Sequence, residues 1–364
     1  MMGVDIMGKI IKSLGINDLK EGMVLSDDIE QNGKMLLGKD IAVNSTMINK
    51  LKDLYYLGEI KVYFDEEQLE DTVDNKKKIE SDKIEEEFNT ISIELKDVFE
   101  EIIDINGNVN NSKMKEIREF AKKIQDELKT TSIVIKNIVL YGSGMDSIYR
   151  HGVNVAALSA LLGKWIGLED KQINLLLYSA MLHDFGKIKI DGNVLNKIEP
   201  LTKSEFELIK THTNIGYNFI KDINYLDKAV SYGVLMHHER MDGSGYPLGI
   251  SGEGIHPFAR IIAIADVFDA INSNRGYKDK KLPFEAMQIV KNESLGKLDY
   301  EYCKVFLEHI GNYYMGEEVL LNTGETCKII QMDLNNIEKP LVFKDGDFIE
   351  LSKVNDLYIK EIIL

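Results

Sequence analysis

Near its middle the chain reads Ile173-Asn-Leu-Leu-Leu-Tyr-Ser-Ala-Met-Leu-His-Asp-Phe-Gly-Lys187. The apolar residues of this stretch predict a helix, and a histidine and an aspartate follow directly at the end of that helix. Similar periodicity predicts further helices at 153–165, 205–220, 229–237 and 258–271. Residues 131–312 are therefore predicted to form one helical domain.

The segments on either side of this domain have a different character. Residues 1–64 contain short apolar runs separated by glycines, which predict a small β-rich module with one helix over 45–56. Residues 65–130 are rich in acids and lysines and predict two amphipathic helices separated near 106–108. These helices could form a solvated spacer or a dimerisation stalk, and the short heptad pattern favours the spacer. Residues 313–364 again predict short strands. The expected fold is mainly α, with a β-rich N-terminal module and a β-rich C-terminal extension.

The composition excludes several classes of protein. The 364 residues are 44% hydrophobic and 29% charged, which is typical of a globular protein with two or three domains. The formal net charge of -16 argues against binding to a nucleic acid polymer or an anionic membrane. Cys303 and Cys327 are too few for a disulfide framework or a thiolate zinc site. We find neither a long apolar run nor a signal peptide, so a cytoplasmic location is expected.

All seven histidines lie in the helical middle region. A single histidine is usually a packed or surface residue, but several histidines beside carboxylates at helix ends indicate metal ligation. In His183-Asp184, the imidazole could bind one metal and the carboxylate could bridge to a second. Gly186 would let the backbone turn sharply and place Lys187 over the site, where its ammonium could hold a phosphate.

A second polar cluster follows another predicted helix. His237 and His238 are consecutive, and both cannot point into one core, so metal ligation or surface exposure are the alternatives. The following residues, 240–247, contain glycines and a proline that would hold a fixed loop, and Tyr246 could stack on a base.

The remaining candidate residues stand apart from these two clusters. His212 lies partway along the helix predicted at 205–220, and His151 precedes the helix at 153–165. Asp266 has apolar neighbours, and a carboxylate buried there needs a partner or a metal. Asp269 could orient a ligand or lie on the helix surface. Nitrogen and oxygen ligands without thiolates suit iron, manganese, zinc, nickel or cobalt. A carboxylate shared by two metals is familiar from phosphoester cleavage.

The ordered set His151, His183-Asp184, His212, His237-His238 and Asp266 closely resembles the HD-GYP family, as does His-His-Glu-Arg-Met-Asp-Gly-Ser-Gly-Tyr-Pro at 237–247. This family comprises bacterial cyclic-dinucleotide phosphodiesterases within the HD superfamily of metal-dependent hydrolases. The resemblance covers about residues 145–310. It implies a helical HD-type phosphohydrolase core that opens cyclic di-GMP to linear pGpG, and in a slower step to GMP, through a metal-bridged hydroxide.

The resemblance also implies a role for each matching residue. The metal ligands would be His151, His183, Asp184, His212, His237, His238 and Asp266. Asp184 would bridge two divalent ions, with iron or manganese expected and zinc, nickel or cobalt as alternatives. Asp184 and Lys187 would be the catalytic residues. The substrate contacts would come from Lys187, Gly245, Tyr246, Arg275 and Lys278.

Two positions depart from the family pattern. Ser147 stands where some members carry a glutamate for a third metal, so two metals are expected, and Gly276 stands where proline is common. The expected partner is a small cyclic dinucleotide. Two other functions stay open, hydrolysis of cyclic GMP-AMP and a non-catalytic receptor for the nucleotide. A homodimer and a signalling partner at the Gly-Tyr-Pro loop are further expectations of the resemblance.

Overall fold

The computed structural model describes residues 3–4, 10–16, 19–31, 34–54, 60–64, 73–102, 110–128, 131–143, 148–197, 199–223, 226–273 and 283–363. Four residues discussed above, Ser147, Arg275, Gly276 and Lys278, lie outside these ranges, as does the break predicted near 106–108. The chain divides into two compact units, Met1–Glu80 and Ser81–Leu364.

The first unit is a small β-rich module. A four-stranded sheet has the order β1-β2-β6-β3, and β4 pairs with β5. The strands are β1 (Gly3–Val4), β2 (Ile10–Leu14), β3 (Val24–Leu25), β4 (Ile29–Gln31), β5 (Lys34–Leu37) and β6 (Ile60–Phe64). In β6, Ile60 and Val62 are buried while Lys61 is exposed, which is the alternation of a half-buried strand. Helix α1 (Ser45–Leu54) begins after Asn44, whose side chain accepts a hydrogen bond from the Met47 backbone N–H at 2.9 Å.

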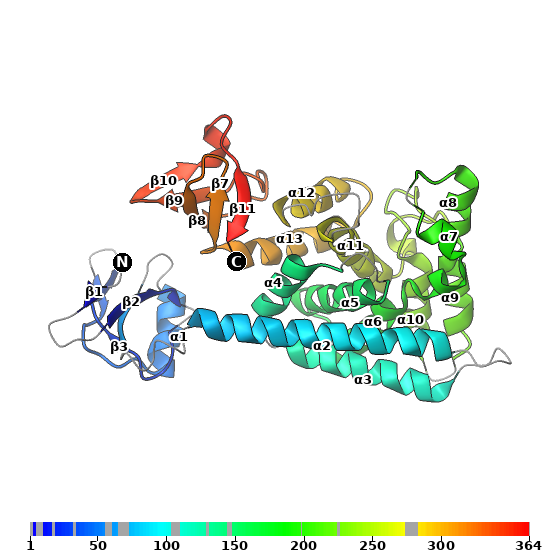
Figure 1. Cartoon of the computed structure of the whole chain (residues 1–364), viewed down its shortest axis with the longest axis horizontal. Helices are drawn as coiled ribbons and strands as arrows, with labels where there is room; N and C mark the ends of the chain where they lie inside the picture. Colours follow the sequence, from blue (N-terminus) through cyan, green and yellow to red (C-terminus); the bar gives the residue numbers. More distant parts are fainter. Residues whose placement is uncertain are drawn as a thin grey trace. The chain divides into compact units, whose positions relative to one another are not determined.

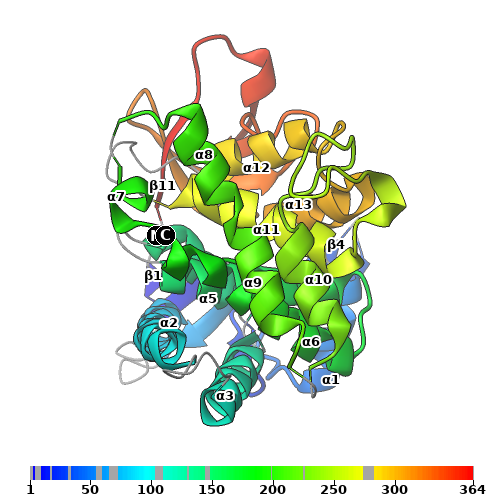
Figure 2. The ribbon, with the colours of Figure 1, turned by 90° about the vertical axis from the view of Figure 1, so that its right-hand side faces the viewer.

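The second unit is mostly helical. Its helices are α2 (Val73–Glu101, from Ser81 on), α3 (Asn111–Glu127), α4 (Thr131–Tyr141), α5 (Ile148–Trp165), α6 (Asp170–Leu182), α7 (Gly192–Leu195), α8 (Lys203–Lys210), α9 (His212–Ile220), α10 (Lys228–Met236), α11 (Pro257–Asn272), α12 (Pro283–Glu293) and α13 (Tyr300–Tyr314), with short 3-10 turns η4 (Phe185–Lys189), η5 (Gly252–Gly254) and η6 (Leu351–Lys353). Figures 1 and 2 show this arrangement. Together with the β-rich ends of the chain, it confirms the fold class predicted from the sequence.

Helix α5 lies at the centre of the second unit. Every residue from Arg150 to Gly163 is buried, and α5 contacts α3, α4, α6, α11 and α13. A helix that is apolar on all sides is expected in such a position. Because α5 is enclosed, its polar side chains must find partners inside the protein.

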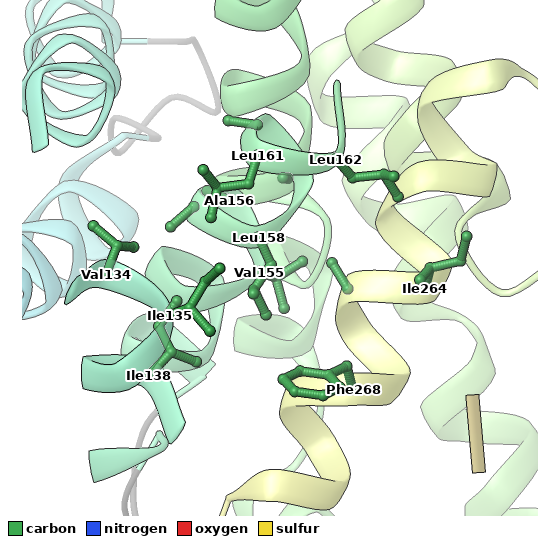
Figure 3. Close-up of a cluster of buried hydrophobic side chains, with 14 of the residues drawn as sticks. Val134, Ile135, Ile138, Val155, Ala156, Leu158, Leu161, Leu162, Ile264 and Phe268 are labelled. Atoms are coloured by element: carbon green, nitrogen blue, oxygen red, sulfur yellow. The ribbon is translucent and has the colours of Figure 1, made fainter. Parts of the chain in front are cut away.

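The apolar core fixes α5 against its neighbours (Figure 3). Ile138 of α4, Leu158 of α5 and Phe268 of α11 are all fully buried in one cluster. Full burial of a side chain of this size stabilises a fold by roughly 1.5–3 kcal/mol. This packing holds α5 and α11, which carry His151 and Asp266, in a defined mutual position.

The predicted spacer also contributes to this core. Phe88 and Leu95 of α2 and Ile117 of α3 are fully buried in the same cluster. The charged residues of both helices lie mainly on the opposite, exposed faces. The choice between a spacer and a dimerisation stalk stays a prediction.

The single helix predicted over 205–220 is wrong, because the segment is divided at Thr211 into α8 and α9. The Thr211 hydroxyl donates to the Leu208 carbonyl at 2.6 Å, and the His212 Nδ1–H donates to the Ile209 carbonyl at 2.7 Å. Both side chains compete with the backbone for the last carbonyls of α8. His212 therefore begins a helix instead of lying partway along one.

The C-terminal residues form a five-stranded antiparallel sheet of order β10-β9-β8-β7-β11. The strands are β7 (Glu318–Leu321), β8 (Thr326–Gln331), β9 (Leu341–Lys344), β10 (Asp347–Glu350) and β11 (Ile359–Ile363). Val319, Ile329 and Val342 are fully buried and extend the core of the second unit. In the described part of the chain, every helix is too short or too polar to cross a bilayer.

The loop after α10 is held by a buried carboxylate. Glu239 is 2% exposed, and it accepts hydrogen bonds from the backbone N–H groups of Leu248 at 2.6 Å, Gly249 at 3.2 Å and Ile250 at 3.2 Å. Gly245 passes so close to the chain that a Cβ atom there would lie 2.4 Å from the His238 carbonyl oxygen. The loop between these residues is thereby pressed against the end of α10.

We expect Glu239→Gln to lower the free energy of unfolding by about 1–3 kcal/mol, because the amide loses the charge of the acceptor and cannot accept on both sides. Urea denaturation of the full chain measures the change. Glu253→Gln is the matched control, since Glu253 is exposed in the same region and should change stability by less than about 0.5 kcal/mol. Equal effects of the two substitutions would contradict this role for Glu239.

Candidate metal centre

Three histidines of the second unit are oriented in the same way. The Nδ1–H groups of His183, His212 and His237 donate to the backbone carbonyls of Ala180, Ile209 and Val234, at 2.7, 2.7 and 2.8 Å. Each carbonyl belongs to the residue three positions earlier, at the end of the preceding helix. Because a carbonyl only accepts, Nδ1 carries the ring proton, and Nε2 of the neutral ring presents a lone pair.

The free nitrogens of His212 and His237 converge on Asp184. The two Nε2 atoms are 3.3 Å apart, and they lie 3.4 and 3.9 Å from Asp184 Oδ1. Burial lowers the pKa of His212, and burial together with the nearby His238 holds the pKa of His237 well below its usual range. Two neutral rings with facing lone pairs cannot hydrogen-bond to each other, so the arrangement favours a shared cation.

His238 completes this group. A ligand atom from each of Asp184, His212, His237 and His238 lies within 4.8 Å of the others, and we call this set the His212 group. Burial lowers the pKa of His238 to about 3, although Asp266 opposes the shift. The ring is therefore neutral over the physiological range, which is the form that binds metals.

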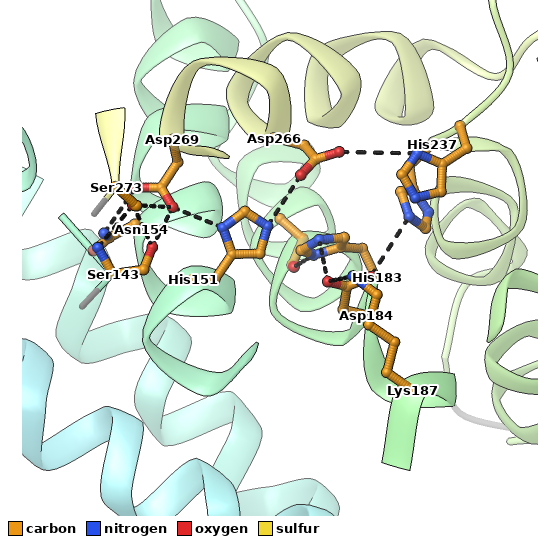
Figure 4. Close-up of polar contacts among 12 residues, drawn as sticks. Ser143, His151, Asn154, His183, Asp184, Lys187, His237, Asp266, Asp269 and Ser273 are labelled. Atoms are coloured by element: carbon orange, nitrogen blue, oxygen red, sulfur yellow. Dashed lines mark hydrogen bonds and ion pairs between the residues drawn. The ribbon is translucent and has the colours of Figure 1, made fainter. Parts of the chain in front are cut away.

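A second set consists of His151, His183 and Asp266, whose ligand atoms also lie within 4.8 Å of one another. We call it the His151 group. His151 Nε2 lies 3.0 Å from Asp266 Oδ1, and His151 Nδ1 lies 2.7 Å from Asp269 Oδ2 (Figure 4). Burial lowers the pKa of His151, but hydrogen bonds with the two carboxylates outweigh it and raise the pKa to about 9.

Asp184 lies between the two groups. Its Oδ2 atom is 3.5 Å from His183 Nε2, and its Oδ1 atom is close to His212. Burial raises the pKa of Asp184, but Lys187 and His183 more than compensate and hold it well below the usual range. His183 Nε2 and Asp184 Oδ1 are buried without a hydrogen-bond partner among the described residues. Buried polar atoms are rarely left unpaired, so these two atoms fit a metal site.

Lys187 reaches the same carboxylate. Its Nζ atom lies 2.6 Å from Asp184 Oδ2. The backbone turns here in the 3-10 turn η4, which contains Gly186, but this turn needs no left-handed residue, since Gly186 is not among the residues with positive φ. Instead, a Cβ atom at this position would lie 2.0 Å from the His212 carbonyl oxygen. Glycine is required because the start of α9 packs directly against η4, which brings His212 next to Asp184.

Aromatic rings extend from the His212 group. The ring centroid of Tyr246 lies 4.7 Å from that of His238. The ammonium of Lys210 is 5.5 Å from the centre of the Tyr246 ring and 4.8 Å from the centre of the half-exposed Phe206 ring. Sequence reasoning singled out Tyr246 but missed Lys210 and Phe206, because their contacts join α8 to a distant loop.

Asp269 is a fully buried carboxylate behind His151. Besides the imidazole, it accepts hydrogen bonds from Ser143 Oγ, from Asn154 Nδ2 at 2.9 Å and from Ser273 Oγ at 3.3 Å. Its spacing of three residues from Asp266 along α11 was the available signal, because positions i and i+3 share a helix face. The sequence left open whether Asp269 orients a ligand or lies on the surface, and the structure shows it buried against His151.

The other residues predicted to contact substrate, and two histidines, do not belong to either ligand group. Gly245 packs against the backbone of 238–240, and Arg275 and Lys278 lie outside the described residues. Two histidines are absent from both groups. His256 caps α11 by accepting from the Phe258 N–H, and His309 stacks on Trp165 with ring centroids 4.5 Å apart.

The chain is similar to several proteins that are named as phosphodiesterases of cyclic dinucleotides. The chain is 30% identical over 226 residues to a cyclic di-GMP phosphodiesterase of Pseudomonas aeruginosa, covering 61% of this chain and 54% of the relative. It is 35% identical over 196 residues to a cyclic di-GMP phosphodiesterase of Thermotoga maritima, covering 53% and 52%. It is 32% identical over 190 residues to 3'3'-cGAMP-specific phosphodiesterase 1 of Vibrio cholerae, covering 52% and 43%.

The chain spans about half the length of these relatives. A family model described as the HD domain matches residues 98–301. The match includes both ligand groups and covers more than half of the sequence. The chain belongs to the HD domain family.

Proposed function

We propose that this chain is a metal-dependent phosphodiesterase that hydrolyses cyclic di-GMP to linear pGpG and, more slowly, to GMP. The observation that carries the proposal is the position of Asp184 between two groups of nitrogen and oxygen ligands. Two ions that share a carboxylate are well suited to phosphoester cleavage. The relatives named as cyclic di-GMP phosphodiesterases support the choice of substrate.

The residues present fit two divalent ions. His151, His183 and Asp266 would hold one ion, His212, His237 and His238 the other, and Asp184 would bridge them. When bound, such ions supply Lewis acidity and neutralise phosphate charge. Imidazole and carboxylate ligands without thiolates favour iron or manganese, with zinc, nickel or cobalt as alternatives. His151 must give up its ring proton at Nε2 in order to ligate, so loading of this group releases a proton.

Residues at the edge of the site would hold the substrate. Lys187 carries the ammonium closest to Asp184, and we propose that it binds a phosphate oxygen and stabilises the charge that develops during cleavage. Tyr246 would stack on a base beside His238, and the backbone of Gly245 holds that loop close. Arg275 and Lys278 are proposed as further phosphate contacts from the family resemblance alone.

Cyclic GMP-AMP is the second candidate substrate. A relative specific for this nucleotide is 32% identical to the chain, similar to the relatives that act on cyclic di-GMP. The proposed ligands bind metals and Lys187 binds a phosphate, and neither contacts the base in which the two nucleotides differ. A homodimer, a signalling partner at the Gly-Tyr-Pro loop and a cytoplasmic location stay predictions.

Turnover of both cyclic dinucleotides by chain purified without oxygen, with metal content measured on the same sample, tests the proposal. We expect about two ions per chain and cleavage of cyclic di-GMP to the linear dinucleotide. Faster cleavage of cyclic GMP-AMP would reassign the substrate. If the chain binds the nucleotide but does not cleave it with either iron or manganese, the result would favour a receptor. If the chain holds no metal even after reconstitution, the result would overturn the proposed metal centre.

Asp184→Asn should remove most of the bound metal and reduce turnover to background, because a neutral amide cannot bridge two cations. Elemental analysis and product chromatography measure the two effects. Asp191→Asn is the matched control, since Asp191 is an exposed N-cap residue close in sequence and asparagine caps equally well. A D184N chain with wild-type metal content and turnover rate would contradict the role of Asp184 as the bridging ligand.

Lys187→Gln should lower kcat for cyclic di-GMP by about 10²-fold, in line with the loss of one charged group that stabilises a transition state. Bound metal should stay at the wild-type level, because Lys187 is not a proposed ligand. Lys189→Gln removes an exposed ammonium two residues away and should leave both quantities unchanged. A K187Q chain with wild-type kcat would remove Lys187 from the mechanism.

A further inference from the structure

A row of polar contacts connects helix α2 with His151. Asp269 forms its inner end, since its Oδ2 atom faces His151 Nδ1 at 2.7 Å. Ser143 and Ser273 also donate to this carboxylate, and Figure 4 shows them around it. The charge of Asp269 is fully buried, and its donors come from α5, from the residue that follows α11 and from the residues that follow α4. The carboxylate is therefore fixed from several sides, and it holds the imidazole in one orientation.

Asn154 forms the middle of the row. It is fully buried on α5, its Nδ2 group donates to Asp269 Oδ1 at 2.9 Å, and its Oδ1 atom accepts from Arg150 Nε at 3.0 Å. An amide has one donor end and one acceptor end, so an anion on one side and a cation on the other define its orientation.

Arg150 forms the outer end and reaches α2. Its guanidinium donates to Glu85 Oε2 at 2.7 Å and to Asn89 Oδ1 at 2.7 Å, and it lies 5.4 Å from the centre of the Phe88 ring. These three residues are four or fewer positions apart on one face of α2. A further bond runs to Asn137 of α4 at 3.2 Å. Arg150 is 4% exposed, so its charge depends on these partners.

We infer that Asp269, Asn154 and Arg150 are positioning residues that make the metal affinity of the His151 group depend on the placement of helix α2. The inference rests on the proposed function, because it takes His151 to be a metal ligand. Two histidines of the His212 group, His212 and His237, are oriented differently, each by the backbone carbonyl of the residue three positions earlier. Disturbing the row should therefore weaken one ion and spare the other.

The experiment is a calorimetric titration of the full-length chain with Mn²⁺, in which His151→Ala identifies the binding event of the His151 group. Asp269→Asn should weaken that event by about 10–100-fold, the usual effect of losing a residue that orients a metal ligand. Arg150→Met, one contact further out, should weaken it by about three- to tenfold, and Glu85→Gln on α2 by about twofold or more. The event of the His212 group should stay within about twofold of wild type.

Arg260→Met is the matched control. Arg260 lies on α11, the helix of Asp266 and Asp269, and it is a partly buried arginine that bonds to the Ile255 carbonyl at 2.9 Å and to Asp299 at 3.3 Å. Its loss should lower stability without changing either metal affinity. If R150M does not fold, D269N and E85Q still decide the question, because Glu85 lies at the partly exposed end of the row.

Equal weakening of both ions, or no change in the His151 event, would overturn the inference. A wild-type chain that binds no metal would overturn both the inference and the proposed function. A wild-type chain that binds two ions without turnover would overturn the phosphodiesterase proposal, and the ratio of the two affinities in the variants would still decide the inference.

Discussion

The burial of the Asp184 carboxylate is the constraint on which the rest of the second unit depends. A carboxylate this deep is stable only if positive charge or strong donors surround it. Lys187 supplies one cation, while His212 and His237 are kept neutral by burial and offer lone pairs instead of protons. The carboxylate of Asp184 is thus surrounded by more hydrogen-bond acceptors than donors. Apolar packing elsewhere offsets this imbalance, since α5 and α11 bury most of their apolar side chains in the core.

Close backbone approach makes this arrangement possible. Gly186 lets η4 touch the start of α9, and Gly245 lets the loop after α10 lie against the backbone of 238–240. Neither glycine acts through a left-handed turn, because both have ordinary φ values. The ends of α6, α8 and α10 can therefore meet, and each is followed by a histidine whose ring donates to a carbonyl of that helix. The geometry of the ligands is largely local, whereas their convergence is a property of the packing.

The order of histidines and aspartates along the chain carries the family resemblance, and that resemblance predicted which side chains would lie close together. The fold class could also be predicted, because apolar periodicity is strong in α5, α6 and α11. Periodicity could not show the division at Thr211. The apolar residues of α8 and α9 follow one another at helical spacing, and the break depends on side-chain hydrogen bonds that leave no mark on this spacing. Periodicity also could not show that Glu239 accepts hydrogen bonds from the loop that follows α10, or that Arg150 bonds to α2. Their partners are far apart in the sequence or are backbone groups, which leave no residue pattern.

The stacking of Trp165 on His309 has a practical consequence for work on the folded chain. Trp165 is the only tryptophan in the sequence, and it lies at the end of α5, next to α13. Tryptophan fluorescence of the intact chain therefore reports on the helical unit and is silent about the N-terminal module. The spectrum therefore follows unfolding of the helical unit alone, without any label.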